Sequence, residues 1–237
     1  MKRIIYDIGS NNGDDIPYYL LKSDMVVSVE ANPNLANQIR SKFAKEIDQN
    51  RVLVENCVIT DNDDMGEVDF YLHKKDHRLS QFPIPLRDTI NCFEKIKLPS
   101  KSIINIINKY GTPYYIKLDV EHYEVPLLNT LFKNNIRPPF ISAEAKVIEV
   151  FETLVNLGKY NVFKLVNGWS IVDIYKNRSI EVYGENISVK YSFPYHSSGP
   201  FGHDLDGLWL DETDFRLVLK DNEEPWKDIH ATTMNLI

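Results

Sequence analysis

The sequence predicts an α/β fold built on a doubly wound, mostly parallel sheet. Short apolar runs alternate with amphipathic stretches of helical length through the first two thirds of the chain. A turn containing two glycines, DIGSNNG at residues 7–13, directly follows the first apolar run, as expected where a strand leads into a helix. The 237 residues, 43% of them hydrophobic, are enough for one large domain with a sizeable core.

The first strands and helices follow from local pattern. We expect buried strands at residues 3–8, 26–31 and 51–59, because each is a short run rich in β-branched side chains. Helices are expected at residues 14–22 and 33–46, where a proline stands near each start. This β-α-β order predicts a parallel sheet that is covered by helices on both faces.

The middle of the chain continues the alternation after one irregular stretch. Residues 67–73 alternate apolar and polar side chains and are expected to pair as an edge hairpin. Residues 76–99 contain three prolines and little periodicity, so we expect a long loop that serves as a binding element or lid. Further helices are expected at 102–111, 122–134 and 147–158, and further strands at 114–120, 139–145 and 160–166.

From Gly168 on, the pattern changes to short strand-like runs: SIVDIY, SIEVY, VKYSF and FRLVLK. No stretch rich in glycine or serine divides the chain before them. We therefore expect a single domain over residues 1–237, with a core at 1–167 and a β-rich C-terminal elaboration at 168–237.

Composition excludes several classes of protein. The formal net charge of −7 disfavours nucleic-acid binding, which depends on clustered lysine and arginine. Cys57 and Cys92 form no metal or redox motif, and two cysteines in a chain of this length favour a reducing compartment. Asp7 interrupts the basic and apolar start before a signal peptide is complete, and no apolar stretch is long enough to cross a bilayer. We expect a cytoplasmic protein without nucleic-acid binding or membrane insertion.

The first turn is built for a ligand that approaches the backbone closely, because Gly9 and Gly13 bracket three small polar residues. A Walker phosphate loop would need a lysine after the second glycine, and none is present. The dinucleotide fingerprint would need glycine where Asn11 stands, and a calcium loop would need glycine at Asn12. These spacings exclude a Walker phosphate loop, a dinucleotide-binding turn and a calcium-binding loop.

Two acids narrow the choice of ligand. Glu30 closes the second predicted strand, where an acidic side chain accepts hydrogen bonds from ribose hydroxyls. Asp7 and Asp14 place negative charge where a pyrophosphate would lie, which disfavours NAD and favours a cationic ligand. S-adenosylmethionine carries a sulfonium, an ammonium group and a ribose but no phosphate, so it fits these constraints better than NAD.

Three segments, DIGSNNGDD, VVSVEANP and YYIKLDVEHYEVPLL, together resemble the FkbM family of S-adenosylmethionine-dependent methyltransferases. The resemblance covers about residues 4–145, and its most specific part is the block from Lys117 to Glu121 with Glu124. It implies a Rossmann-like class I methyltransferase fold and methylation of hydroxyl oxygens on sugars, glycans or polyketide-type products. One departure is that His122 stands where the family has glycine.

The resemblance also implies cofactor-binding residues in three places. In the first turn it implies contacts with the methionine moiety, from Asp7, Gly9, Ser10, Asn11 and Gly13. After the second strand it implies contacts with the ribose, from Glu30 and the adjoining Asn32. At the end of the third strand it implies contacts near the adenine, from Asn56, Cys57 and Val58.

Two acids at the ends of adjacent predicted strands, Asp119 and Glu144, are the first catalytic candidates. They would act as a general base and its partner, or together hold a divalent cation such as Mg²⁺ that lowers the pKa of an acceptor hydroxyl. The alternative is structural, with one acid capping a helix or pairing with Lys117 or Lys146.

The segment YHSSGPFGHDLDG, residues 195–207, is the second dense region. We expect a loop over the acceptor site, with His196 or His203 as a general base. Aromatic residues of the elaboration are candidates for stacking on a sugar: Trp169, Tyr195, Phe201 and Trp209. The terminal segment WKDIHA, 226–231, is expected to be a packed structural element despite its histidine.

Together these features predict an S-adenosylmethionine-dependent O-methyltransferase that acts on a hydroxyl of a sugar, glycan or related natural product. Methylation of a nitrogen or phosphoramidate-type group, and a cofactor-binding adaptor in glycan assembly without turnover, are the alternatives. The expected partner is a small-molecule or glycan acceptor, and the sequence leaves a homodimer open.

Overall fold

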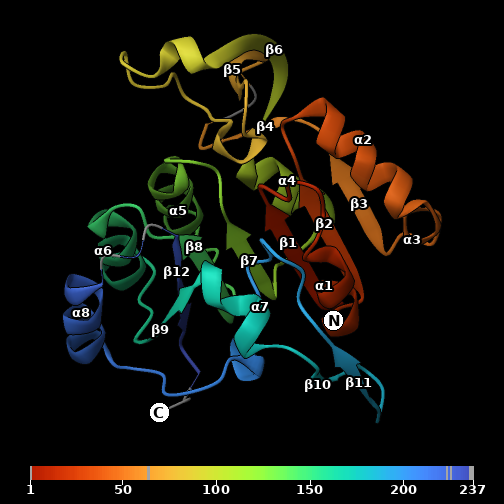
Figure 1. The fold of residues 1–237 in the computed structure, drawn as a ribbon, viewed down its shortest axis with the longest axis vertical. Helices are drawn as coiled ribbons and strands as arrows, with labels where there is room; N and C mark the ends of the chain where they lie inside the picture. The colour runs from red at the N-terminus through yellow and green to blue at the C-terminus, as the bar shows by residue number, and fades with distance from the viewer. Residues whose placement is uncertain (1, 63–64, 223, 225, 235–237) are drawn as a thin grey trace.

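The computed structural model describes residues 2–62, 65–222, 224 and 226–234, and its centre is a seven-stranded sheet (Figure 1). The strands are β1 (Ile4–Ile8), β2 (Met25–Val29), β3 (Val52–Glu55), β7 (Tyr115–Leu118), β8 (Phe140–Glu144), β9 (Val162–Asn167) and β12 (Lys227–Thr232). Their order is β3-β2-β1-β7-β8-β12-β9, and β12 alone runs antiparallel to both of its neighbours. The predicted α/β class and mostly parallel sheet are therefore confirmed.

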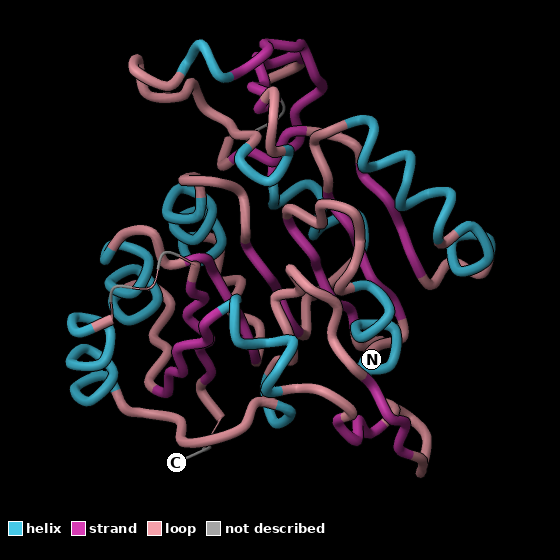
Figure 2. Tube along the Cα trace, in the orientation of Figure 1, coloured by secondary structure: helices cyan, strands magenta, loops and turns pink. Residues whose placement is uncertain are grey.

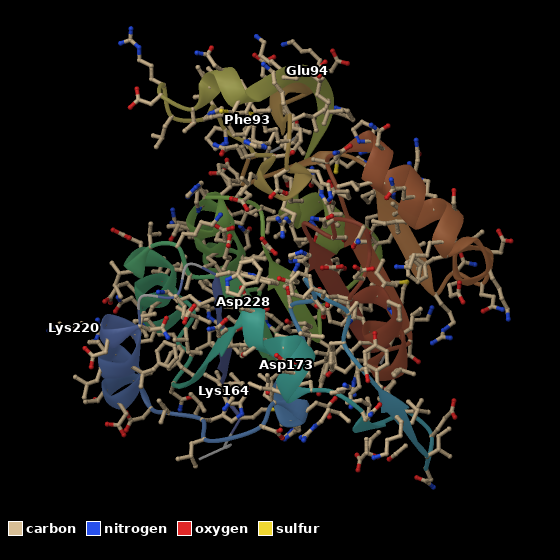
Figure 3. The ribbon with its side chains drawn as sticks, in the orientation of Figure 1. Phe93, Glu94, Lys164, Asp173, Lys220 and Asp228 are labelled. Carbon is tan, nitrogen blue, oxygen red and sulfur yellow. The ribbon has the colours of Figure 1, made fainter. Side chains whose placement is uncertain are left out.

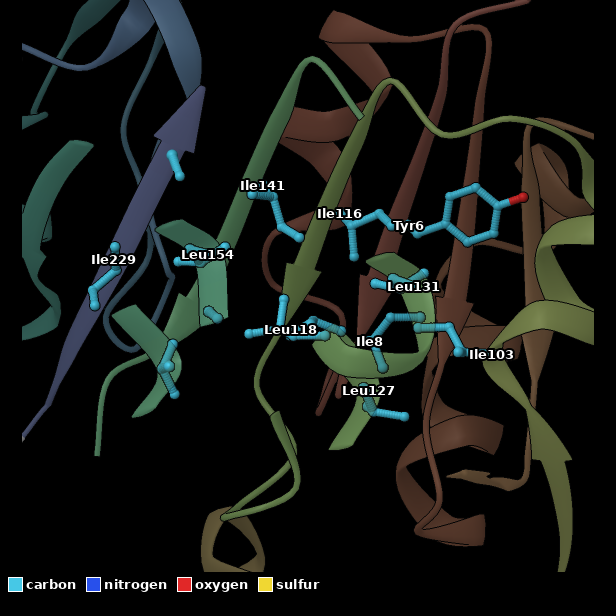
Figure 4. Close-up of a cluster of buried hydrophobic side chains, with 14 of the residues drawn as sticks. Tyr6, Ile8, Ile103, Ile116, Leu118, Leu127, Leu131, Ile141, Leu154 and Ile229 are labelled. Carbon is cyan, nitrogen blue, oxygen red and sulfur yellow. The ribbon is translucent and has the colours of Figure 1, made fainter. Parts of the chain in front are cut away.

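Helices cover both faces of this sheet. One face is covered by α4 (Ile103–Tyr110), α5 (Glu124–Lys133), α6 (Ile148–Asn156) and α8 (Glu212–Asp221), whose apolar side chains share a core with Ile4, Tyr6 and Ile8 (Figure 4). The other face is covered by α1 (Ile16–Lys22), α2 (Pro33–Lys42), the short α3 (Ala44–Asp48) and α7 (Ile171–Ile174). Ile5 points to this second core, because successive strand residues face opposite sides.

The strand order reverses between β1 and β7. The chain runs outward from β1 through β2 to β3, and returns to β7 on the other side of β1. In open α/β sheets, such a switch point leaves a crevice at the carboxyl ends of the strands, where ligands bind. The turn after β1 and the residues after β7 and β8 lie at this edge.

A three-stranded sheet made by β4 (Val58–Thr60), β5 (Glu67–His73) and β6 (Phe93–Ser102) stands apart from the main sheet, at the top of Figure 2. We call residues 58–102 the lid. The predicted strand 51–59 is wrong as one element, because it breaks at Asn56 and Cys57 between β3 and β4. The predicted loop 76–99 is also wrong in its second half, since β6 pairs antiparallel along β5 and supplies the expected hairpin partner.

Two of the four predicted C-terminal strands are helical. The SIVDIY segment, residues 170–175, begins at the last residue of the 3-10 helix Gly168–Ser170 and contains α7. FRLVLK lies in α8, with Phe215 and Leu219 buried on one face. The other two form a hairpin, β10 (Arg178–Glu181) with β11 (Ser188–Tyr191). The predicted core and elaboration are interleaved, because β12 inserts between β8 and β9.

The segment WKDIHA is a packed structural element, as predicted, because it forms most of β12. His230 in this strand is 2% exposed, and burial lowers its pKa to about 3, so it is neutral in the interior. Asp228, labelled in Figure 3, is also buried on β12, opposite Glu144 of β8. No helix among the described residues is long and apolar enough to span a bilayer.

Candidate active site

The first turn is held against its neighbours by backbone contacts. Gly9, Asn11 and Gly13 have φ values of 83°, 50° and 76°, in the left-handed region that glycine and asparagine tolerate best. The N–H groups of Gly9 and Ser10 donate to the carbonyl of Val29 at 2.9 and 3.1 Å. The turn is therefore fixed over the end of β2 and presents its backbone to the crevice.

Glu30, directly after β2, is oriented by two backbone amides. Its Oε2 accepts from the N–H of Asn11 and its Oε1 from the N–H of Asn32, both at 2.7 Å. The side chain is 8% exposed, and burial raises its pKa to about 7 although the two hydrogen bonds oppose the rise. A carboxylate oxygen accepts more than one hydrogen bond, so Glu30 retains acceptor capacity for a ligand.

Lys117 of β7 lies between two acids at the floor of the crevice. Its Nζ is 3.7 Å from Oδ1 of Asp7 and 3.2 Å from Oδ2 of Asp119, and donates to the carbonyl of Gly9 at 3.4 Å. Burial raises the pKa of Asp7 to about 6. Burial lowers the pKa of Lys117, but the surrounding acids raise it more strongly and hold it well above its usual value. Lys117 is therefore a buried cation that fixes the strand end beneath the first turn.

Three carboxyl groups converge beside it. One oxygen each of Asp119, Glu121 and Glu144 lie within 4.8 Å of one another. The Nζ of Lys146 is ion-paired with Glu121 and lies 3.1 Å from Oε2 of Glu144. Burial and the charge of Asp119 raise the pKa of Glu144 to about 9, so this carboxyl group holds a proton at neutral pH.

The turn that carries Asp119 and Glu121 has an unusual backbone. Glu121 and His122 have φ values of 50° and 73°, in the region where a glycine would be unstrained. The carboxylate of Glu124 accepts from the N–H of Val120 at 2.9 Å and closes the turn. His122 therefore stands in a backbone conformation that glycine adopts without strain, and its side chain is exposed outside the cavity.

The lid reaches the site through Arg78. One edge of the Arg78 guanidinium, formed by Nε and Nη2, donates to the two carboxylate oxygens of Asp76. Its Nη1 lies 2.9 and 3.0 Å from the two ring nitrogens of His196. Burial and the charge of Arg78 lower the pKa of His196, so the imidazole is neutral at physiological pH. The segment that carries His196 is anchored from below, because Asp15 accepts from the hydroxyl of Ser197 and the N–H of Ser198.

These groups enclose one cavity of about 850 Å³. Its volume lies toward the upper end of the usual range for small-molecule sites. All three predicted catalytic residues, Asp119, Glu144 and His196, line it. Six of the predicted cofactor residues line it as well: Gly9, Ser10, Asn11, Glu30, Cys57 and Val58.

The other four predicted cofactor residues lie behind the cavity wall. Asp7 is fully buried beneath the turn, and Gly13 packs against Ile16, Ile39 and Phe43. Asn32 caps α2 by accepting from the N–H of Asn34. Asn56 donates to the carbonyls of Glu30 and Ala31 at 2.8 and 2.9 Å, so it supports Glu30 from behind.

The other aromatic and histidine candidates divide in the same way. Trp169 lines the cavity, and Tyr195 lies beside it at the rim with 57% of its surface exposed. Phe201 and Trp209 are buried in the core, and His203 packs edge-on against Phe140 at the start of β8, away from the carboxyl edge. Of the 195–207 segment, the part near His196 therefore belongs to the site and the later part is structural.

Sequence reasoning gave Arg78 and Trp226 no role in the site and considered Lys146 only as a pairing partner of an acid, yet all three line the cavity. The sequence contained a signal for Lys146. It follows Glu144 by two residues, just as Lys117 precedes Asp119 by two, and side chains two residues apart in a strand point to the same face. Arg78 lay in a segment taken for an irregular loop. Trp226 enters only because β12 inserts into the main sheet.

Known proteins resemble this chain in sequence and in structure. Residues 7–162 match the family model described as the methyltransferase FkbM domain, and no curated protein matches by sequence. A solved FkbM methyltransferase from Methylobacillus flagellatus KT is 12% identical with a TM-score of 0.45, over 69% of this chain and 39% of that one. A precorrin-6y C5,15-methyltransferase from Geobacter metallireducens GS-15 is 11% identical with a TM-score of 0.42, over 98% and 80%.

A third solved structure, a SAM-dependent O-methyltransferase from Thermotoga maritima, is 11% identical with a TM-score of 0.39, over 98% of this chain and 59% of that one. All three TM-scores lie below 0.5, so these structural likenesses are weak. The family match is different, because it spans more than half of the chain and includes the first turn, Glu30 and the block from Lys117 to Glu124. The chain belongs to the FkbM methyltransferase family.

Proposed function

We propose that this protein transfers the methyl group of S-adenosylmethionine to a hydroxyl oxygen of a sugar or glycan. The proposal rests on the observation that the candidate cofactor-binding acid and the candidate catalytic acids line the same cavity. One wall has Glu30, fixed by two backbone amides at the end of β2, and the other has Asp119 and Glu144 at the ends of β7 and β8.

The wall near β1 and β2 suits the cofactor. Glu30 is placed to accept hydrogen bonds from the two ribose hydroxyls. The acid-rich surroundings favour the sulfonium and ammonium charges of S-adenosylmethionine. Cys57, Val58 and Ile59 give the same wall an apolar stretch that suits the adenine ring. The backbone of the first turn is left to bind the methionine end.

The opposite wall suits a sugar. Trp169 lines the cavity with 42% of its surface exposed, and its ring stands edge-on to that of Trp226 at a centroid distance of 5.2 Å. Exposed aromatic faces beside polar groups give a saccharide both apolar and hydrogen-bonding contacts. Asp119 and His196 border the same space. An acceptor that stacks on Trp169 would therefore direct a hydroxyl toward the carboxyl cluster.

The chemical step is a displacement at carbon. The acceptor oxygen forms a bond to the methyl carbon while the bond from that carbon to sulfur breaks, and its electron pair neutralises the sulfonium. Alignment of the two reactants can supply a large share of the rate enhancement. The hydroxyl proton passes to a base, and Asp119 is the better candidate of the two acids because Glu144 already holds a proton near neutral pH.

We propose two other forms of the reaction as alternatives. The convergence of Asp119, Glu121 and Glu144 is compatible with a divalent cation that would lower the pKa of the hydroxyl. The same negative wall would also attract an amine acceptor, whose methylation needs no strong base. Chelation would abolish activity in the first case, and Asp119→Asn would leave most activity in the second.

The experiment is transfer of radioactive methyl from labelled S-adenosylmethionine to a panel of mono- and oligosaccharides, with amino sugars included. We expect label in a saccharide product and its loss with Asp119→Asn. Asp173→Asn, in α7 outside the cavity lining, is the matched control and should retain activity. Label that appears only in amine acceptors would overturn the choice of oxygen as the nucleophile.

A further inference from the structure

Lys146 lies where a bound cation would otherwise be expected. The carboxyl oxygens of Asp119, Glu121 and Glu144 approach within 4.8 Å, and the ammonium of Lys146 is in contact with two of the three residues. It follows Glu144 by two residues, just after the end of β8, and its Nζ reaches the carboxyl group of that residue. The chain thus supplies its own positive charge at the centre of the acidic wall.

Such a charge is required by the burial of these acids. Glu121 is 9% exposed, so water screens the repulsion between its charge and that of Asp119 only weakly. Lys117 pairs with Asp7 and Asp119, from a position where its side chain is 5% exposed. Lys146 pairs with Glu121 and Glu144, and its side chain is 20% exposed. Both lysines line the cavity, and Lys146 is the more exposed of the two.

An ammonium group has three N–H donors. Glu121 accepts a hydrogen bond from one of them, and Oε2 of Glu144 lies 3.1 Å from the same nitrogen, so at least one donor remains for a ligand in the cavity. A donor here faces the same space as Asp119, the proposed base. A hydroxyl placed between them would donate its proton to Asp119 and accept a hydrogen bond from Lys146.

On the basis of the proposed function, we propose that Lys146 is the resident cation of the site and binds the acceptor oxygen directly. Its charge stabilises the negative charge that develops on this oxygen as the proton passes to Asp119. The oxygen then bonds to the methyl carbon, and the carbon–sulfur electron pair remains on sulfur. A divalent ion would need the same carboxylates and the same space, so the ammonium and the ion exclude each other.

The test uses the purified full chain and Mn²⁺, whose free concentration is measured by electron paramagnetic resonance. Lys146→Met removes the charge and keeps the length of the side chain. Lys75→Met is the matched control, because Lys75 also lines the cavity but lies in the lid, outside the acidic cluster. A third variant combines Lys146→Met with Glu144→Gln. S-adenosylhomocysteine binding is measured on every variant by calorimetry.

We expect the wild type and Lys75→Met to bind Mn²⁺ weakly, and Lys146→Met to bind it at least tenfold more tightly. The double variant should lose this gain, and all variants should bind S-adenosylhomocysteine within about threefold of the wild type. Tight Mn²⁺ binding by the wild type, or no gain with Lys146→Met, would overturn the role of Lys146. Failure of the wild type to bind S-adenosylhomocysteine would instead overturn the proposed function, independently of the Mn²⁺ result.

Discussion

Gly9 and Asp119 are packed so closely that no side chain fits between them. A Cβ atom placed on Gly9 would lie 1.8 Å from the carbonyl oxygen of Asp119, and Gly9 has a φ of +83°. The N–H of Asp119 in turn donates to the carbonyl of Ile8 at 3.0 Å. The cofactor turn and the end of the catalytic strand are thus one unit, and a change in either shifts the other.

Gly9→Ala is therefore expected to lower both the stability of the protein and its affinity for S-adenosylhomocysteine. Gly184→Ala is the matched control, because Gly184 has a φ of +77° but no atom within 4 Å of an added Cβ. Both variants carry backbone strain of about 1–2 kcal/mol, and Gly9→Ala adds the clash with Asp119. Urea unfolding and calorimetry measure the difference, and equal effects from both variants would count against the packing argument.

His122→Gly is expected to stabilise the protein by up to about 1 kcal/mol. Glycine removes the strain of the left-handed backbone at this position, and this gain exceeds the loss of stability from the greater conformational entropy of glycine in the unfolded chain. His122→Ala keeps a Cβ at the same φ and should show no gain. The free energies of unfolding in urea distinguish the two. A gain with alanine equal to that with glycine would show that the imidazole, and not the backbone, is the source of strain.

Stability is expected to fall between pH 6.5 and 8.5. Burial raises the pKa values of Glu30 and Glu124 to about 7 and that of Asp228 to about 8, so the folded state keeps protons that the unfolded chain releases. These groups make their full contribution to the free energy of unfolding below their unfolded-state pKa values, near 4. The contribution is lost as the pH rises through their folded-state pKa values. His230 opposes this only below about pH 6.5, where the unfolded imidazole takes up a proton.

We expect the free energy of unfolding in urea to fall by about 1–2 kcal/mol between pH 6.5 and 8.5. This is less than the three pKa shifts would give independently, because the acids lie close to one another and titrate together. Asp228→Asn, which removes one of the three groups, should reduce the slope. A wild-type stability that stays level or rises from pH 6.5 to 8.5 would contradict the burial of these acids in protonated form.

Much of the site was predictable because it is encoded locally. The first turn, Glu30, Asp119 and Glu144 each follow directly from a strand, and the alternation of strands and helices fixes the edge of the sheet at which strand ends meet. The short C-terminal runs were less clear. In FRLVLK, the two-residue spacing of Phe215 and Leu217 fits a strand, whereas the four-residue spacing of Phe215 and Leu219 fits a helix. The segment is helical because Phe215 and Leu219 pack into the core of the main sheet.

The remaining parts of the site depend on contacts between distant segments. Arg78 meets His196 across 118 positions, and the sequence holds no local pattern that pairs them. Trp226 lines the cavity because β12, which follows β9 by many residues, returns to the main sheet between β8 and β9. Such placements come from tertiary packing, so single-sequence reasoning had no route to them.

Trp169→Ala is expected to raise the KM for a saccharide acceptor by about tenfold, because loss of a large apolar contact costs about 1.5–3 kcal/mol when it is fully buried and less at a rim. The affinity for S-adenosylhomocysteine should not change. Trp209→Phe is the control, since Trp209 is 6% exposed and lies outside the cavity lining. A rise in KM with both variants would point to a general loss of structure, which circular dichroism would detect.

Calorimetric titration with S-adenosylhomocysteine tests the cofactor pocket most directly, in the wild type, Glu30→Gln and Glu55→Gln. Glu55 is the control because it is also buried at a strand end but is paired with Lys101 and Lys109 outside the cavity lining. We expect binding in the micromolar range for the wild type and Glu55→Gln, and at least about tenfold weaker binding for Glu30→Gln, because a charged acceptor of the ribose hydroxyls is lost. No binding by the wild type, or equal affinity in all three proteins, would contradict a methyltransferase site built around Glu30.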